Sequence, residues 1–277
     1  RAIISDLATG RAAARAFSLM MIVAGVAPIV APLAGGFLVE PLGWRGALAV
    51  ILGLVVLMLV AVLAVVRETH TSERRAGLRD ERAAAGSPLR DLAGRTYLGN
   101  MIAFGFAFAV MMAYISASPF VYQTMMGLSS AEYGMMFGVN AFGLLLMSAL
   151  SARWTARAEP RSLARAGLLV IVVSSVAVWA LAVSPAPAGW LALPLFTTVS
   201  AMGLIFGNTT ALALSAAPRA AGTASAALGA TQFLLAALVS PLVSIGGEHT
   251  AEPLAVVMVV ASVLACAGFA LARPASE

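Results

Sequence analysis

Polar side chains that could hydrogen-bond a small molecule are few in this chain, and they are scattered through long apolar runs. An amide or hydroxyl inside such a run can line a binding pocket, or it can bond a neighbouring helix, because a polar group in lipid needs a partner. Both roles stay open for each residue. The best candidates for binding a small molecule are Tyr114, Ser118, Asn140, Asn208 and Gln232.

The same runs lack the residues of a proton relay or an enzyme centre. No Asp or Glu lies inside any of them, and Glu132, at the outer edge of one run, comes closest. A carboxylate within the membrane is the usual proton carrier, so this segment does not contain one. The runs hold no His-Glu-x-x-His, Gly-x-Ser-x-Gly or phosphate-binding loop. His70, His249 and Cys266 are too widely spaced for a ligand set, so we predict no catalytic residue, no metal and no cofactor.

The elements that must position these residues are predicted to be membrane-spanning helices. The chain of 277 residues is 61% hydrophobic and only 10% charged, with a mean hydropathy of +0.96. These values are typical of an all-helical polytopic membrane protein rather than a soluble domain. Runs long enough to cross about 30 Å of hydrocarbon lie at 17–39, 44–66, 96–119, 132–152, 164–184, 189–213, 220–244 and 253–272.

The distribution of arginine predicts how these spans are oriented. All 17 basic residues are Arg, and all but Arg45 fall in the loops of one face. The positive-inside rule places that face in the cytoplasm, together with the residue 1 end, the polar stretch 67–95 and the C-terminus. The basic character therefore reflects membrane topology, and we predict no binding to nucleic acid.

The only long polar stretch divides the chain into unequal parts. We predict a transmembrane segment over 1–66, a cytoplasmic linker over 67–95 and a six-helix transmembrane half over 96–277. Two spans precede the linker and six follow it. This split is expected when a protein of two six-helix halves lacks its first four helices.

Local sequence also predicts where helices bend or pack closely. Gly25 to Gly36 contains two prolines and a closing glycine pair inside one span, Pro28, Pro32, Gly35 and Gly36. It is interpreted as a packing kink or as a deformable segment that controls switching. The Tyr-x-Ser-x-Ser-Pro segment ending at Pro119 predicts a perturbed helix near its outer end. The pairs Gly134/Gly138 and Gly203/Gly207 predict close helix contacts.

Several of these stretches resemble the Bcr/CflA drug-resistance transporters of the major facilitator superfamily. The resemblance covers most of the chain and follows the family's order. The stretches that carry the resemblance are Arg1-Ala-Ile-Ile-Ser-Asp6, the Pro28–Gly36 segment, Tyr114–Pro119, Gly222-Thr-Ala-Ser-Ala and Gln232-Phe-Leu-Leu. The Pro28–Gly36 segment is similar to the antiporter signature Gly-Pro-x-x-Gly-Gly, with Ala31 in place of the first Gly.

The resemblance implies a major facilitator fold with eight of its twelve transmembrane helices present. It implies proton-coupled efflux of drugs or other small molecules across the bacterial inner membrane by alternating access. Nothing in the sequence demands more than a monomer. The family's Asp-Arg-x-Gly-Arg loop and its membrane-embedded proton-binding acid are expected upstream of Arg1. The alternatives are a metabolite exporter or importer of the same fold, a membrane enzyme, or an inactive gene fragment.

Overall fold

The computed structural model of the chain describes residues 10–65, 92–217 and 220–272, without the side chains of residues 10–29, 32, 33 and 221. Within these ranges every regular element is a helix. Seven helical stretches there are long and apolar enough to cross a membrane. The first of the eight expected runs, 17–39, falls mainly where side chains are not described. The residue 1 end, most of the predicted linker 67–95 and residues 273–277 lie outside the described residues.

The chain divides into two compact units. Unit 1 comprises residues 1–86 and 130–138, and unit 2 comprises residues 87–129 and 139–277. The predicted boundary between a first transmembrane segment and a six-helix half lies within 67–95, and the change from unit 1 to unit 2 at Gly86 falls in the same stretch. The assignment of 130–138 to unit 1 was not expected from the sequence.

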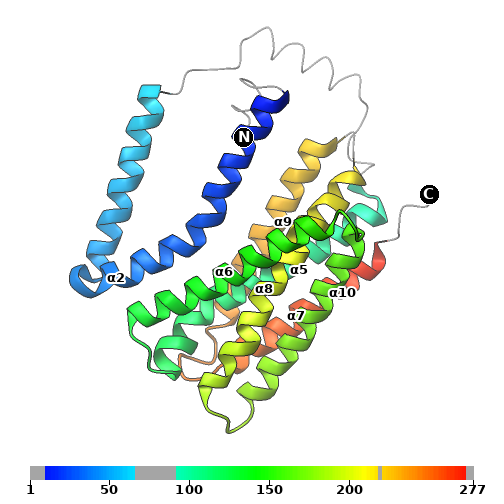
Figure 1. Cartoon of the computed structure of the whole chain (residues 1–277). Helices are drawn as coiled ribbons and strands as arrows, with labels where there is room; N and C mark the ends of the chain where they lie inside the picture. Colours follow the sequence, from blue (N-terminus) through cyan, green and yellow to red (C-terminus); the bar gives the residue numbers. More distant parts are fainter. Residues whose placement is uncertain (1–9, 66–91, 218–219, 273–277) are drawn as a thin grey trace. The chain divides into compact units, whose positions relative to one another are not determined.

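In unit 1, helix α2 (Gly10–Val65) contains one sharp break, at Gly43. Gly43 has φ 63° and ψ 178°, a backbone conformation that glycine adopts without a Cβ clash. The chain turns back at this point, so α2 consists of two limbs (Figure 1). This break falls between the predicted spans 17–39 and 44–66. Pro28 and Pro32 do not interrupt the first limb, whose backbone dihedrals stay helical through both.

The second limb of α2, residues 44–65, is apolar and exposed on nearly all sides. A helix that is hydrophobic all round is surrounded by lipid or by other helices. At its start, the Arg45 guanidinium lies 4.9 Å from the centre of the Trp44 ring. An aromatic ring and an arginine at this turn are the residues expected at the water edge of a membrane.

Unit 2 contains the six spans predicted after the linker, except for residues 130–138 at the start of the second of them, which belong to unit 1. They are α5 (Arg95–Pro119) with its π-helical continuation η1 (Phe120–Met125), α6 (Ser130–Trp154), α7 (Pro160–Ala182), α8 (Ala192–Ser215) preceded by the 3₁₀ turn η2 (Ala188–Leu191), α9 (Ala221–Leu242) and α10 (Glu252–Leu271). Helix α5 packs against α8, α9 and α10, and α7 packs against α8 and α10.

Small residues allow these helices to approach closely. A Cβ added at Gly99 of α5 would meet the backbone of α10 at 2.6 Å, and one added at Gly268 of α10 would meet Ile102 of α5 at 2.4 Å. A Cβ at Gly203 of α8 would meet backbone atoms of α6 at 2.5 to 2.8 Å, whereas one at Gly207 would meet nothing within 4 Å. The predicted glycine contact is therefore confirmed at Gly203 and is wrong at Gly207.

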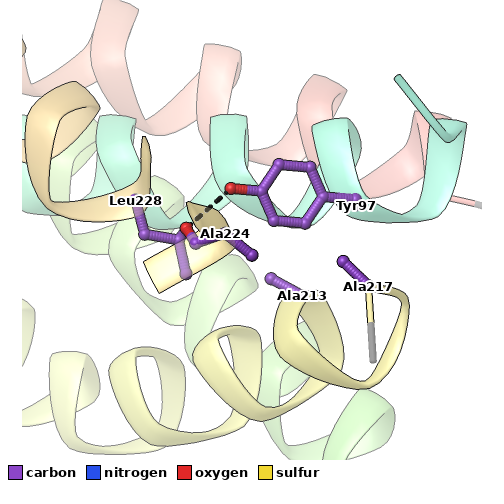
Figure 2. Packing of buried hydrophobic residues seen from close by; sticks show 5 residues of the cluster. All are labelled: Tyr97, Ala213, Ala217, Ala224 and Leu228. Atoms are coloured by element: carbon purple, nitrogen blue, oxygen red, sulfur yellow. Dashed lines mark hydrogen bonds between the residues drawn. The ribbon is translucent and has the colours of Figure 1, made fainter. Parts of the chain in front are cut away.

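Tyr97 fixes the first turn of α5 to the start of α9. Its phenol donates a hydrogen bond of 2.8 Å to the carbonyl of Ala224, and its ring packs among small residues of α8 and α9 (Figure 2). The cluster is completed by Ala213, Ala217 and Leu228. Ala224 belongs to the Gly222-Thr-Ala-Ser-Ala stretch, so this contact gives that stretch a place in the packing of unit 2.

Candidate functional site

A buried cluster of three polar side chains lies inside unit 2, where α5 passes into η1. The Asn140 amide donates from Nδ2 to the Tyr114 hydroxyl at 2.9 Å and to the Tyr122 hydroxyl at 3.1 Å. Tyr114 and Asn140 are each 1% exposed, and Tyr122 is 0% exposed. We call these three residues the tyrosine–asparagine cluster. It brings together two of the five residues predicted from the sequence.

The π-helix at the end of α5 explains why Tyr122 belongs to this cluster. In a regular α-helix, residues eight positions apart differ by about 80° around the axis. The wider π turn advances by a smaller angle per residue, which brings Tyr122 nearer the face that carries Tyr114. The Met126 N–H donates to the Val121 carbonyl at 3.1 Å, five residues back, as a π-helix requires. The predicted helix perturbation near Pro119 is thus confirmed.

Sequence reasoning missed Tyr122 because it ended this span at residue 119. The sequence does contain a signal that the helix continues: Tyr122 lies three residues beyond Pro119 and before the first loop-forming glycine, Gly127. Gly127, with φ 74°, is the first residue after Pro119 at which the chain leaves the helix through a positive φ. The helical stretch therefore runs to Met125.

Ser118 lies one turn beyond Tyr114, and its side chain bonds the backbone of its own helix. Its hydroxyl donates to the Ile115 carbonyl at 3.1 Å, and the residue is fully buried. A serine that bonds back to its own backbone often bends a helix slightly. Ser118 therefore contributes to the local geometry just before the π-helix.

Asn208 connects two helices away from the cluster. Its Nδ2 donates to the Ser151 hydroxyl of α6 at 2.8 Å and to the Leu204 carbonyl of its own helix at 2.7 Å. The side chain is buried, and both of its N–H groups have protein partners. This geometry favours packing of α6 against α8 over lining of a pocket.

Gln232 stands apart from the other predicted residues. It is half-buried on α9, and its side chain makes no hydrogen bond with the described part of the chain. Of the five predicted binding residues, the structure therefore joins Tyr114 to Asn140 directly, whereas Ser118 bonds its own backbone and Asn208 bonds Ser151 and its own helix.

The proline–glycine segment lies on the first limb of α2. The structure does not describe the side chains of Pro28 and Pro32, but it does describe Gly35 and Gly36. A Cβ at Gly36 would meet the carbonyl oxygen of Ser130 at 2.7 Å, within unit 1, whereas a Cβ at Gly35 would meet nothing within 4 Å. Gly36 is buried and Gly35 is half-buried, so the close approach is made at Gly36.

Acidic side chains are confined to the ends of the described spans. Within residues 10–65, 92–217 and 220–272, the carboxylates lie beside the α2 break, in first turns or in loops, at Glu40, Glu132, Glu159, Glu248 and Glu252. The same residues contain no group of three or more His, Cys, Asp or Glu side chains that could hold a metal ion. The tyrosine–asparagine cluster is neutral, so its chemistry is hydrogen bonding.

Comparison with known sequences supports transport. The sequence profile of the Major Facilitator Superfamily matches residues 1–241. The uncharacterized MFS-type transporter YdgK of Bacillus subtilis is 32% identical over 275 residues, which cover 97% of this chain and 67% of that protein. The bicyclomycin resistance protein homolog of Haemophilus influenzae is 28% identical over 269 residues, covering 95% of this chain and 67% of that protein.

A further group of relatives is named for multidrug transport. The multidrug transporter MdfA of Escherichia coli O157:H7 is 31% identical over 224 residues, covering 79% of this chain and 53% of that protein. The chain thus spans about half to two thirds of the length of these relatives. Their names confirm the resemblance to drug-resistance transporters of the Bcr/CflA type, and none of these names is that of an enzyme.

Proposed function

Because this chain belongs to the Major Facilitator Superfamily, we propose that it forms part of an exporter of drug-like small molecules in the bacterial inner membrane. The proposal of drug export rests on the similarity, over 95% of the chain, to a relative named for bicyclomycin resistance. Transport would proceed by alternating access, in which two transmembrane halves rock about a site near the membrane midplane. The predicted linker at residues 67–95, which separates two spans from the six that follow, supports an arrangement in two transmembrane halves.

We assign the tyrosine–asparagine cluster a role in recognising the substrate. In the state described, Asn140 Nδ2 bonds both hydroxyls, the Asn140 Oδ1 is buried without a hydrogen bond to the described residues, and all three side chains are closed to solvent. A conformational change that separates α5 from α6 would free these groups to bond a ligand, at little net cost because one set of hydrogen bonds replaces another. The neutral cluster fits uncharged or aromatic drugs with a few polar atoms.

Protons would supply the driving force. Carboxylates of the described spans lie only at their ends, so we place the coupling acid outside the described spans. We also assign the region around Gly36 a role in switching, because this glycine lies against the Ser130 backbone and has no room for a side chain. Both assignments rest on the family's transport activity.

The test is accumulation of ethidium in cells that lack their own efflux pumps and express the full-length protein. We expect expression to lower steady-state fluorescence, and we expect a protonophore to abolish the difference. Higher accumulation on expression would indicate an importer and would overturn the proposal. An effect that survives the protonophore would overturn proton coupling alone.

The role of the cluster is tested with a pair of asparagine variants. We expect Asn140→Leu to change the relative resistance to different drugs, because it removes two bonds from the candidate pocket. Asn208→Leu is the matched control, since it also removes two hydrogen bonds of a buried asparagine amide, one to Ser151 of α6 and one within α8. Equal loss of transport of all drugs in both variants would assign Asn140 to packing.

A further inference from the structure

A groove of about 270 Å³ lies between α7 and α10, at the end of the spans that carries most of the arginines. Its walls are apolar, and two arginines of the first turns of α7 stand at one end. The lining residues that matter here are Arg161, Arg165, Leu168, Leu169, Cys266 and Phe269. None of them belongs to the tyrosine–asparagine cluster.

Arg161 is held in place by α10. Its guanidinium lies 4.8 Å from the centre of the Phe269 ring, and Nη2 donates a hydrogen bond to the carbonyl of Ala272. A guanidinium has five N–H donors, so further donors remain for an acceptor at the groove. Because both contacts come from α10, the charge stays at the mouth of the groove.

Arg165 lies four residues later, on the same face of α7 as Arg161. It is exposed, and no carboxylate of the described residues forms an ion pair with either arginine. Like charges at this spacing repel one another by a few tenths of a kcal/mol. With no acid of the described residues beside them, the two guanidiniums are available to an anionic group, which arginine binds through strong, often bidentate, hydrogen bonds.

The groove beyond the arginines is suited to a hydrocarbon chain. Leu168, Leu169 and Phe269 contribute apolar walls, and Leu169 is 57% exposed. A free phosphate would use the two charges but would leave this apolar groove unused. A lipid with an anionic headgroup would use both parts at once, as basic pockets between transmembrane helices do at the cytoplasmic surface.

We propose that this groove binds one anionic phospholipid of the leaflet at the arginine-rich face. The headgroup phosphate bonds Arg161 and Arg165, and one acyl chain lies along the groove between α7 and α10. Such a lipid would join the two helices at that face and neutralise the repulsion between the arginines. The site is separate from substrate recognition and does not depend on the direction of transport.

Native mass spectrometry of the full-length protein, with phosphatidylglycerol or phosphatidylethanolamine added to the detergent, tests this proposal. We expect phosphatidylglycerol to bind more tightly than phosphatidylethanolamine. An arginine near an anionic lipid contributes about fivefold to binding, so Arg161→Gln with Arg165→Gln should weaken it about 25-fold. The matched control is Arg153→Gln with Arg157→Gln, which removes the same charge from the end of α6 and the turn before α7, outside the groove.

Two further variants keep the proposal testable if loss of Arg161 impairs folding. Arg165→Gln alone removes a side chain for which the structure gives no bond, and it should weaken binding about fivefold. Ala270→Trp keeps both arginines and fills the groove, so it should reduce retention of the two-chain lipid. The proposal is overturned if the control pair has the same effect as the groove pair, or if both lipids bind equally. It is also overturned if inorganic phosphate competes as well as the lipid does.

Discussion

Replacing Gly203 by alanine tests the contact between α6 and α8 most directly. A Cβ at this position would meet Ser148 N at 2.5 Å, Leu144 O at 2.7 Å and Met147 C at 2.8 Å. These are backbone atoms of α6, so no side-chain rotation can relieve the clash. Ordinary contact begins at 3.4 Å, and the two helices would therefore have to separate by roughly 1 Å.

The magnitude follows from two opposing effects. Overpacking a tight contact costs about 1–3 kcal/mol. Alanine in place of a helical glycine contributes about 1 kcal/mol in the opposite direction. We expect Gly203→Ala to lower the free energy of unfolding by about 0–2 kcal/mol as the balance of these two effects.

Gly207→Ala is the matched control, because Gly207 lies one turn later on α8 and has nothing within 4 Å of its added Cβ. This variant receives the helix-propensity gain without the clash, so it should be about 1 kcal/mol more stable than the parent protein. The assay is the thermal unfolding midpoint of each variant in the same detergent, with unfolding in mixed micelles to obtain free energies. Equal stability of the two variants would refute the α6–α8 geometry.

Three other substitutions test separate contacts. Tyr97→Phe removes one hydrogen bond and should cost about 0.5–1.5 kcal/mol in stability, measured by unfolding; unchanged stability would contradict that bond. Asn208→Ala and Ser151→Ala should show a coupling of about 0.6 kcal/mol in a double-mutant cycle, whereas strict additivity would mean that the two side chains do not interact. Gly36→Leu should abolish export with normal membrane insertion, while Gly35→Leu should retain more activity, because only Gly36 lacks room for a side chain; the opposite order in a transport assay would refute the packing described for Gly36.

Much of the fold could be predicted because burial in lipid imposes long apolar segments with clear ends. The turn before Trp44 lies between the predicted spans 17–39 and 44–66, and Gly43 supplies the positive φ that the turn requires. Boundaries of the six later spans differ from the predicted ones by only a few residues, apart from the helical extension to Met125.

The candidate site was less predictable because hydrogen-bond partners depend on helix rotation and neighbour identity. Asn140 and Asn208 are the same residue type in similar apolar surroundings, yet one meets two tyrosines and the other meets a serine and its own backbone. Gly203 and Gly207 likewise share a motif, and only the position of α6 distinguishes them. Periodicity places a residue on a face, but it does not identify the neighbour.

The π-helix at residues 120–125 has a consequence for how relatives of this chain should be aligned. A π turn contains about one residue more than an α turn, so a relative that lacks one residue here can continue as a regular α-helix to the same loop. A one-residue gap at this point would then be structural and should not be closed by shifting the alignment. Relatives with the gap should also lack the pairing of Asn140 with a second tyrosine. The length of this short segment therefore predicts which members of the family share the tyrosine–asparagine cluster.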